Sequence, residues 1–568
     1  MHLMTRAKTS DGLALRRPGR RAARASDEGG FAMVATMAAL MVSTLFVVGA
    51  FAAANGDLPT ADYDVDKKQA YSAAEAGVAN YLFHLNQDND YWALCTDVPA
   101  PSAVNQPWDG AGADPRAWRR VPGSTSEYTI ELLPVAGRSS CDVTDAQGSM
   151  IDAKSGTFRI RASGRTAGVK RSIVATFKRR GFLDFLYFTD YETSDPTWYE
   201  LNAMARPTRI SATNPTDIVT WAAQNCGNRW WRQGRGSQQY AGQWLVTGFW
   251  VDMPVQRCTE IQFVAGDVIA GPLHTNDELL ICGNPVFGRP APFEDRVETS
   301  AGKPDSLLPQ DLGWRPNGAC AVANPVFRGE RLPGSPYVNL PPSNSALRQV
   351  ADPAYRFSGR TTIVLGGASM TVNGVNMALP ANGVVYVENG ACGVRYKPLD
   401  PYNAPAGCAD LYLKGDYSKS LTIASEKDII INGGIQRSGD AMLGLIANNF
   451  IRVYHPVNRN PDNPTSCTNA AGVLPGLRID AAMLSLADSF TVDNYYCGAP
   501  MGNLIINGVI AQKYRGPVGR SQGSTQINGY LKQYTYDDRL KFLSPPHFLD
   551  PVQAAWRTQR YTEQIPPR

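Results

Sequence analysis

The chain has 568 residues, of which 43% are hydrophobic and 19% charged, an ordinary globular composition that excludes wholesale disorder. The first thirty residues carry seven of the 55 Lys and Arg and three of the 51 Asp and Glu, so the rest of the chain has no net charge. A nucleic-acid-binding body is therefore disfavoured, because neutralising phosphates needs a positive surface. At roughly 150 residues per domain, the length predicts three or four structural units.

An apolar segment follows the basic leader. Residues 31–54 contain no charged residue and no proline. As a helix they would span about 36 Å, enough to cross a bilayer core of about 30 Å. Because the basic flank is N-terminal, residues 1–30 are expected in the cytoplasm and everything after residue 54 outside it. A plain membrane anchor and a secretory signal cleaved after Ala54 are two ordinary interpretations of this segment.

The residues directly before the apolar helix are Asp27, Glu28, Gly29 and Gly30, and the helix begins with Phe31. A charged leader, a glycine and a phenylalanine ahead of such a helix resemble the leader of type IV prepilins. The resemblance implies that a membrane prepilin peptidase cuts between Gly30 and Phe31 and methylates the new N-terminal Phe31. It also implies that the helix is kept as the assembly element and that other pilins are the partners in a filament.

A second segment, residues 73–77 (A-A-E-A-G), is typical of PilX-type minor pilins and K-type pseudopilins, where it extends the helix out of the membrane. Apolar residues recur there at helical spacing and predict one packing stripe. The stripe consists of Ala70, Ala74, Gly77, Val78, Tyr81, Leu82 and Leu85. Asn55, Gly56 and Pro59 predict a break or kink between the membrane helix and this stem.

One position departs from the pilin pattern. Most pilins have a glutamate five residues in from the cut, which pairs with the N-terminal ammonium of a neighbouring subunit in the apolar filament core. Here that position is Ala35. An unpaired charge in such a core is costly. K-type subunits that lack this glutamate sit at the filament tip, so the resemblance implies a tip or initiator role and not a major pilin.

The body after the stem is expected to be rich in strands. Alternating runs over 127–133, 157–163 and 171–177 predict antiparallel strands joined by short turns, as in a pilin head. From about residue 260, short β-branched runs broken by Asn-Gly predict a mainly-β body. A parallel β-solenoid is favoured for it and a β-sandwich is the alternative, so the expected fold class is α+β. A short helix is predicted near residues 552–561.

These patterns divide the chain into seven predicted segments. They are a leader at 1–30, a transmembrane and assembly helix at 31–54, a helical stem at 55–90, a pilin-like α/β head at 91–180, a loop-rich and Trp-rich insertion at 181–258, a β-solenoid-like domain at 259–548 and a C-terminal tail at 549–568.

All ten cysteines follow the apolar helix, and an even number in an exported protein predicts disulfides. Sequential pairing is the simplest hypothesis, although the sequence does not fix the connectivity. The pairs would be Cys95–Cys141, Cys226–Cys258, Cys282–Cys320, Cys392–Cys408 and Cys467–Cys497. No C-x₂-C motif or Cys/His cluster occurs, so no metal site is predicted.

Catalytic signatures are missing from the sequence. It contains no G-x-S-x-G, H-E-x-x-H or P-loop motif, so we expect no enzyme, no catalytic residue and no cofactor. His274 lies in a predicted loop beside Asn276 and Asp277 and is expected to be a hydrogen-bonded turn histidine. An acid/base or metal role is the alternative for it.

Two polar or aromatic clusters keep a binding function open. The acidic cluster Asp184, Asp190, Glu192, Asp195 and Glu200 is expected to be a polar loop, with calcium or glycan binding as the alternative. Five tryptophans with interleaved arginines would suit a glycan or partner surface, although a core for the insertion is favoured. They are Trp221, Trp230, Trp231, Trp244 and Trp250.

The sequence thus predicts a large minor pilin of a type IV pilus or related filament, for assembly initiation or surface contact. It would cross the membrane once before assembly and then lie outside the cell. The alternative is a membrane-anchored or secreted β-solenoid carbohydrate-binding protein or glycan-active enzyme, but no carboxylate spacing marks a catalytic pair. A structural surface protein with an uncleaved anchor is the third hypothesis.

Overall fold

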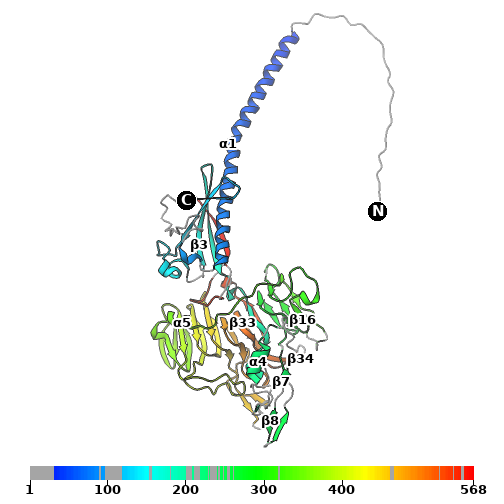
Figure 1. Cartoon of the computed structure of the whole chain (residues 1–568), viewed down its shortest axis with the longest axis vertical. Helices are drawn as coiled ribbons and strands as arrows, with labels where there is room; N and C mark the ends of the chain where they lie inside the picture. The colour runs from blue at the N-terminus through cyan, green and yellow to red at the C-terminus, as the bar shows by residue number, and fades with distance from the viewer. Residues whose placement is uncertain are drawn as a thin grey trace, which may run out of the picture. The chain divides into compact units, whose positions relative to one another are not determined.

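Helix α1 (Phe31–Gln87) is the longest element of the chain (Figure 1). The computed structural model describes residues 31–567 except 89–90, 96–117, 153–156, 180, 200–207, 210–217, 228, 230–238, 241–242, 247–248, 253–255, 260, 294, 317–319, 321, 461–465, 523–524, 542 and 552–555. The chain divides into two compact units, Met1–Gln69 and Ala70–Arg568.

The N-terminal part of α1 is long and apolar enough to cross a membrane over Met33–Phe51, 19 residues with a mean hydropathy of 2.1. The predicted break at Asn55, Gly56 and Pro59 is wrong, because the helix continues through all three. A proline removes one backbone hydrogen bond and can bend a helix. The turns on both sides keep their own bonds, so a single proline need not end it.

A five-stranded antiparallel sheet follows the stem, in the order β1-β2-β3-β4-β36. Its strands are β1 (Arg119–Arg120), β2 (Glu127–Leu133), β3 (Thr157–Thr166), β4 (Val169–Arg179) and β36 (Trp556–Gln564). The three runs predicted as antiparallel strands correspond to β2, β3 and β4. Ala167 and Gly168, both with positive φ, form the tight turn between β3 and β4.

The last strand of this sheet corrects the prediction for the C-terminus. Residues 549–568 were expected to be a tail with a short helix, but Trp556–Gln564 forms β36 and pairs antiparallel with β4. The short segment has no strong period of its own, and the exposed edge of β4 supplies the partner that makes it a strand. The large β body is therefore inserted between β4 and β36, two neighbouring strands of one sheet.

The end of α1 packs on this small sheet through the predicted stripe. Ala70, Ala74, Val78, Tyr81 and Leu85 are fully buried. All of them except Ala70 form one core with inward-facing residues of the sheet, among them Ile130, Phe158, Ile160, Ile173 and Phe177. Glycines allow the close approach, since a Cβ on Gly164 of β3 would lie 2.0 Å from the carbonyl oxygen of Ala70.

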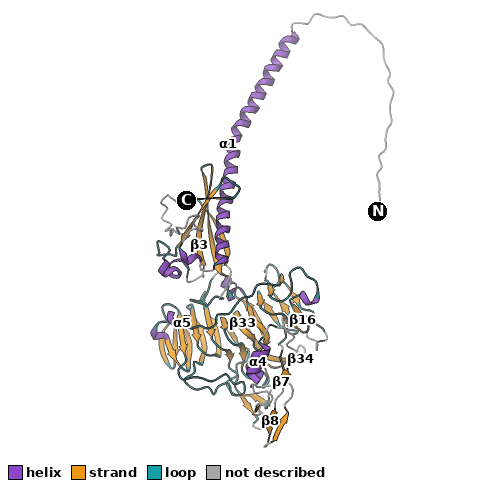
Figure 2. Cartoon of the chain, in the orientation of Figure 1, coloured by secondary structure: helices purple, strands orange, loops and turns teal. Residues whose placement is uncertain are grey.

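The inserted body is built from short parallel strands, drawn in orange in Figure 2. The first ladder pairs, in spatial order, β18 (Arg331–Pro333), β15 (Val297–Thr299), β12 (Leu273–Thr275), β5 (Tyr187–Ser194), β33 (Pro500–Arg515), β31 (Arg478–Ser485), β27 (Leu443–Ala447), β25 (Leu421–Ser425), β23 (Val384–Glu388) and β19 (Arg356–Ser358). All of these pairings are parallel, whereas a β-sandwich of the usual kind is antiparallel.

Further parallel ladders use neighbouring stretches of the same turns. One pairs β17 (Val326–Phe327), β14 (Val286–Phe287), β11 (Val268–Ala270), β35 (Thr525–Tyr536) and β33. Another pairs β20 (Thr361–Gly367), β24 (Leu411–Tyr417), β26 (Ile429–Arg437), β28 (Ile451–Val453) and β32 (Phe490–Val492). Strand β13 (Leu279–Ile281) pairs with β16 (Trp314–Pro316). The fold is thus α+β with a mainly-β body, and a closed solenoid stays a prediction.

The chain enters the first ladder in its middle, at β5. From β11 to β18 it builds towards one end, and residues 334–355 then carry it to the other end at β19. From β19 it builds back until β33 pairs with β5 and β35 pairs with β11. Asn344 secures the crossing segment, because its buried amide donates to the carbonyl oxygens of Ser425 (2.7 Å) and Ile446 (3.1 Å).

The remaining elements are short. The other α-helices among the described residues are α2 (Ala146–Met150), α4 (Ile218–Cys226) and α5 (Ser345–Val350). The remaining strands pair antiparallel and are β6 (Thr208–Arg209), β7 (Gln239–Tyr240), β8 (Gln243–Val246), β9 (Phe249–Asp252), β10 (Gln256–Arg257), β21 (Ser369–Val372), β22 (Val375–Ala378), β29 (Val457–Arg459), β30 (Cys467–Asn469) and β34 (Gly519–Gln522).

The close approach of α1 to β3 gives a stability prediction. Gly164→Ala should destabilise the chain by about 1–3 kcal/mol, because the new methyl group overlaps the helix backbone. Gly366→Ala is the matched control, since a Cβ at that position in β20 would meet its nearest atom at 3.5 Å. Urea unfolding followed by circular dichroism would measure both. Equal stability of the two variants would contradict the packing described here.

Candidate functional site

The first candidate site is the N-terminal end of α1. Phe31 is its first residue, Ala35 is exposed, and Gly30 lies outside the described residues. All side chains from Met33 to Phe51 are exposed, Phe46 to 76%. An apolar surface of this length needs lipid or other protein segments around it. The helix can therefore act as a membrane span or as a helix-packing surface.

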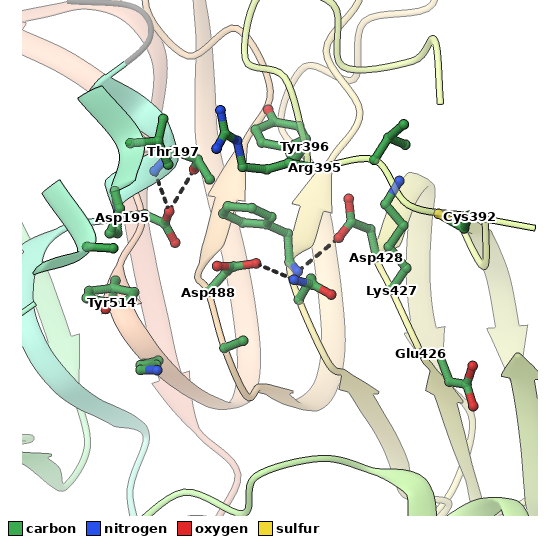
Figure 3. A pocket seen from close by; sticks show the side chains of 18 of the residues that line it. Asp195, Thr197, Cys392, Arg395, Tyr396, Glu426, Lys427, Asp428, Asp488 and Tyr514 are labelled. Atoms are coloured by element: carbon green, nitrogen blue, oxygen red, sulfur yellow. Dashed lines mark hydrogen bonds between the residues drawn. The ribbon is translucent and has the colours of Figure 1, made fainter. Parts of the chain in front are cut away.

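A second candidate site is a cavity of about 540 Å³ in the β body, within the usual range for small-molecule sites (Figure 3). Its floor comes from the turns that follow neighbouring strands of the first ladder. Asp195 follows β5, Asp488 follows β31, Asn449 follows β27, and Lys427 and Asp428 follow β25. Because the ladder is parallel, these turns meet at one edge and repeat at about the 4.8 Å strand spacing.

Two disulfide-fastened segments wall this cavity. Residues 392–396 belong to the long connection between β23 and β24, which the Cys392–Cys408 disulfide closes. On the other side stand Val219 and Ala223 of α4, whose last residue forms the Cys226–Cys258 disulfide. Each wall is therefore closed by a disulfide within its own connection.

Three carboxyl groups line the cavity in unusual states. Asp195 accepts hydrogen bonds from the Thr197 backbone N–H (2.9 Å) and from the Ser489 hydroxyl (3.2 Å), yet burial raises its pKa to about 6. Burial also raises the pKa of Asp428 to about 6, against the opposing charge of Arg452. For Asp488, burial and the nearby Asp195 charge together hold the pKa well above its usual range.

The cavity therefore offers both hydrogen-bond donors and acceptors near neutral pH. Protonated carboxyl groups donate, ionised ones accept, and Lys513 adds positive charge at the lining. Tyr396 and Tyr514 contribute aromatic faces. In the part of the chain that the structure describes, no three His, Cys, Asp or Glu side chains converge as metal ligands. This chemistry suits a small polyhydroxylated or amine-bearing ligand.

Sequence reasoning missed this cavity. The sequence predicts Asp195 in an acidic loop, and Asp428 and Asp488 lie at the edges of apolar runs without a motif. Their one common signal is that each borders a short β-run, which places it in a turn. Only the stacking of strands from distant parts of the chain brings the three turns together.

The acidic cluster at 184–200 does not form one site. The expectation of a polar loop is wrong, because residues 187–194 form β5 inside the large sheet. Its charges have separate partners, since Asp190 pairs with Arg229 (2.6 Å) and Glu192 pairs with Arg515 (2.9 Å). Asp184 accepts a hydrogen bond from the Gly181 backbone, and Glu200 lies outside the described residues.

His274 is a buried structural residue on strand β12 and not in a loop. Its Nε2 donates to Asn276 Oδ1 (3.1 Å), whose amide nitrogen is itself a donor to Asp190. Its Nδ1 lies within hydrogen-bond distance of Glu298 Oε2, at 3.0 Å. The ring stacks on Phe188 at an interplanar angle of 9°.

The tryptophans do not form one described surface. Trp221 is buried on α4 against Tyr199, so it belongs to a core and not to a ligand face. Trp244 lies in β8 and Trp250 in β9, two strands of one hairpin. Trp230 and Trp231 lie outside the described residues.

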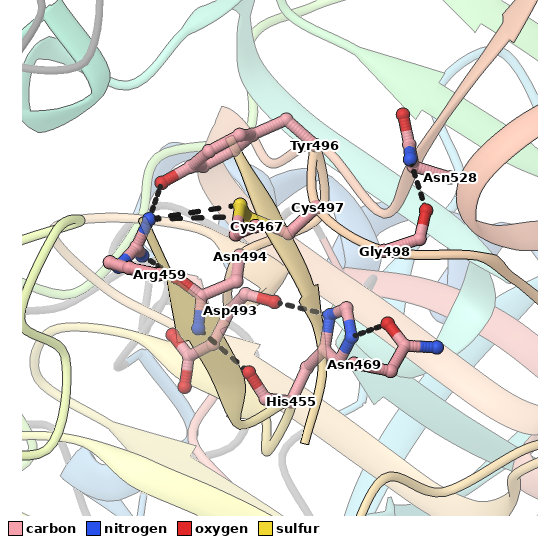
Figure 4. The surroundings of a disulfide bond; sticks show 10 residues. All are labelled: His455, Arg459, Cys467, Asn469, Asp493, Asn494, Tyr496, Cys497, Gly498 and Asn528. Atoms are coloured by element: carbon pink, nitrogen blue, oxygen red, sulfur yellow. Dashed lines mark hydrogen bonds between the residues drawn. A yellow bond between two sulfur atoms is a disulfide. The ribbon is translucent and has the colours of Figure 1, made fainter. Parts of the chain in front are cut away.

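The structure pairs the ten cysteines in chain order. The disulfides are Cys95–Cys141, Cys226–Cys258, Cys282–Cys320, Cys392–Cys408 and Cys467–Cys497. Polar contacts surround the last pair, where Arg459 donates to the Tyr496 hydroxyl at 2.9 Å (Figure 4). Disulfides persist in oxidising compartments, so these bonds indicate a location outside the cytoplasm.

Comparisons with known proteins add little beyond this geometry. No protein-family model and no curated protein sequence matches the chain. Among solved structures, it is similar to the crystal structure of the competence-associated pilin ComZ from Thermus thermophilus, with 12% sequence identity and a TM-score of 0.27. The match covers 88% of this chain and 97% of that chain. Function is therefore argued from the chain's own residues.

The cavity carboxyls predict an unusual pH dependence of stability. The pKa of Asp195 is about 6 in the fold and about 4 in an unfolded chain, so folding takes up protons between these values. The contribution of Asp195 to the free energy of unfolding is therefore greatest below pH 4. It decreases as the pH rises from 4 to 6 and stays at its lowest value above 6. Asp195→Asn keeps the hydrogen bonds and should stabilise the chain by about 2 kcal/mol at pH 7.5.

Urea unfolding at pH 7.5 and pH 4.5 would test this, with the gain shrinking at the lower pH. Asp142→Asn is the control, because Asp142 is exposed and hydrogen bonds from Thr144 lower its pKa. It should give no gain at pH 7.5. A stabilisation by Asp195→Asn that is the same at both pH values would contradict the assignment.

Proposed function

We propose that this chain is a large, PilX-like minor pilin of a type IV pilus or a related filament. A prepilin peptidase removes residues 1–30 by cutting after Gly30 and methylates Phe31. Residues 31–54 first span the membrane and then join the helices of other pilins in the filament core. The disulfide-bonded body lies outside the cytoplasm and serves assembly initiation or surface contact.

The observation that carries this proposal is the two-part character of α1. Its first part, Met33–Phe51, leaves every apolar side chain exposed, whereas its last turns are buried on a small antiparallel sheet. A helix of this kind has one end fixed in a folded head and the other free to exchange lipid for other helices. A plain anchor accounts for the apolar part, but not for the Gly30-Phe31 leader directly before it.

The same proposal places the subunit at the filament tip. Ala35 cannot neutralise the N-terminal ammonium of another subunit. Such a charge left unpaired in an apolar core is unfavourable by several kcal/mol. A position with no subunit ahead avoids that cost, while the ammonium of Phe31 can still meet the glutamate of a subunit behind it.

Mass spectrometry of the mature N-terminus, on protein purified from the native host, tests the processing. We expect a chain that begins with N-methylated Phe31. Cleavage after Ala54 would instead indicate a released protein, and an intact leader would indicate a plain membrane anchor. Either of those results would contradict the pilin proposal.

Substitution at position 35 tests the tip assignment. Ala35→Glu supplies the missing carboxylate, so the variant should enter the filament shaft and its copy number per filament should rise several-fold. Ala35→Gln has the same size without the charge and should stay at the wild-type level. Quantitative immunoblotting of sheared filaments measures both, and an equal rise for the two variants would contradict the charge argument.

A second candidate function is carbohydrate binding by the body, either on the filament or as a membrane-anchored protein. The cavity supports it, because carboxyl, amide, lysine and tyrosine side chains meet there in a volume that fits one or two sugar units. Its position along stacked parallel turns also suits the proposed solenoid. In the alternative function that the sequence leaves open, the same body would be a glycan-active enzyme.

A glycan panel with the full-length chain separates these functions. Binding that Lys513→Ala weakens at least ten-fold and Asp142→Asn leaves unchanged would support the cavity as a carbohydrate site. Cleavage of a bound glycan would favour the enzyme. No binding to any glycan would remove this second function and leave the pilin proposal untouched.

A further inference from the structure

A lysine and two aspartates lie together beside the cavity, on neighbouring turns of the β body. Asp410 directly precedes β24 and Asp428 directly precedes β26. These strands pair in parallel with Leu411 opposite Ile429, so the two aspartates occupy equivalent positions on adjacent turns. Lys427 lies next to Asp428 along the chain. Two acids stacked in this way repel each other, and the lysine supplies the compensating charge.

The contact between Lys427 and Asp410 is unusual. Lys427 Nζ lies 3.4 Å from Asp410 Oδ1, and the two side chains are only 8% and 2% exposed. Despite this proximity, none of the described residues forms a hydrogen bond with Asp410 Oδ1. Buried carboxylate oxygens are normally satisfied, because leaving one without a hydrogen bond is unfavourable. The amine therefore lies within ion-pair distance of the carboxyl group but without the geometry of a hydrogen bond.

We propose that Lys427 and Asp410 form an intramolecular amide (isopeptide) bond. In a buried pair the proton can pass from the ammonium to the carboxylate, which leaves a neutral amine and a carboxylic acid. The Nζ lone pair then forms a bond to Cγ of Asp410, and one Cγ–O bond breaks. The departing oxygen leaves as one water molecule with two protons, and the amide nitrogen keeps one hydrogen. No oxidant, metal or other reactant is needed.

Asp428 is placed to carry the protons in this reaction. It is buried, lies one turn from Asp410 and next to Lys427 in the chain, and interacts electrostatically with both. It also accepts a hydrogen bond from Arg452 Nε at 3.0 Å. Its pKa of about 6 suits a group that both accepts and donates a proton near neutral pH. A second cavity of about 80 Å³, lined by all three residues, can receive the water that leaves.

The chain contains a matched pair that lacks these features. Lys532 Nζ lies 2.8 Å from Asp267 Oδ2 and donates a hydrogen bond to it. That oxygen also accepts from the Val264 backbone. Lys532 and Asp267 thus form a fully satisfied ion pair, and we expect no covalent bond between them.

Peptide mapping of the full-length chain, reduced, alkylated and digested with trypsin, tests the bond. Trypsin cuts after Arg395, Lys414, Lys419 and Arg437, but not after a lysine in amide linkage. We expect fragments 396–414 and 420–437 as one species, lighter than their sum by one water molecule. Cleavage after Lys532 should be normal. Release of free fragment 420–427 from the wild-type chain would overturn the proposal.

Variants of Lys427 and Asp428 test the role of each residue in forming the amide bond. Lys427→Arg keeps the positive charge but cannot form the amide, so fragments 396–414 and 420–427 should be released separately. Asp428→Asn should lower the cross-linked fraction at least ten-fold, and Asp428→Glu should restore part of it. A cross-link that persists in Lys427→Arg would overturn the assignment. If a variant fails to fold, the wild-type map alone still decides whether the bond exists.

Discussion

The pairing of β5 with β33 is the contact on which the rest of the body depends. It joins the first strand of the insertion to one of the last, and the buried ion pair between Glu192 and Arg515 bridges residues 323 positions apart. Either charge alone would be very costly at that depth, so the pair strongly penalises a wrong register. Because β33 returns to β5 in the middle of the first ladder, the chain ends near where the insertion began, and β4 and β36 can lie side by side in the small sheet.

The cavity follows from the same stacking. A short parallel strand buries its apolar side chains only when another turn lies on each side of it. The turns must then fall at one edge of the ladder, whatever residues they contain. Asp195, Asp488 and Asp428 are brought together in this way, although each is remote in sequence from the next. Burial raises the pKa values of all three, and neighbouring carboxyl charges add to the rise for Asp428 and Asp488.

The first part of helix α1 and the body differ in how they place their apolar side chains. The body buries a large apolar core, and buried charges such as Glu192 and Arg515 pair with each other. The first part of α1 exposes 19 consecutive mainly apolar residues and has no charge to pair. This contrast is local and needs no tertiary contact, which is why composition alone revealed it. The buried stripe from Ala70 to Leu85 was equally readable, because helical spacing marks the packed face.

The sequence by itself determined the features set by local pattern: the apolar helix, the stripe, the strands β2 to β4 and the mainly-β character of the body. The ten cysteines also predicted disulfides, but the sequence did not fix which cysteines pair. Only the tertiary structure decided that Trp556–Gln564 is a strand, that β5 is a central rung and that Pro59 lies within a continuous helix. The tertiary structure alone also decided that the cavity exists. Each of these depends on partners far away in the chain, and residue spacing carries no information about such partners until the strands have stacked.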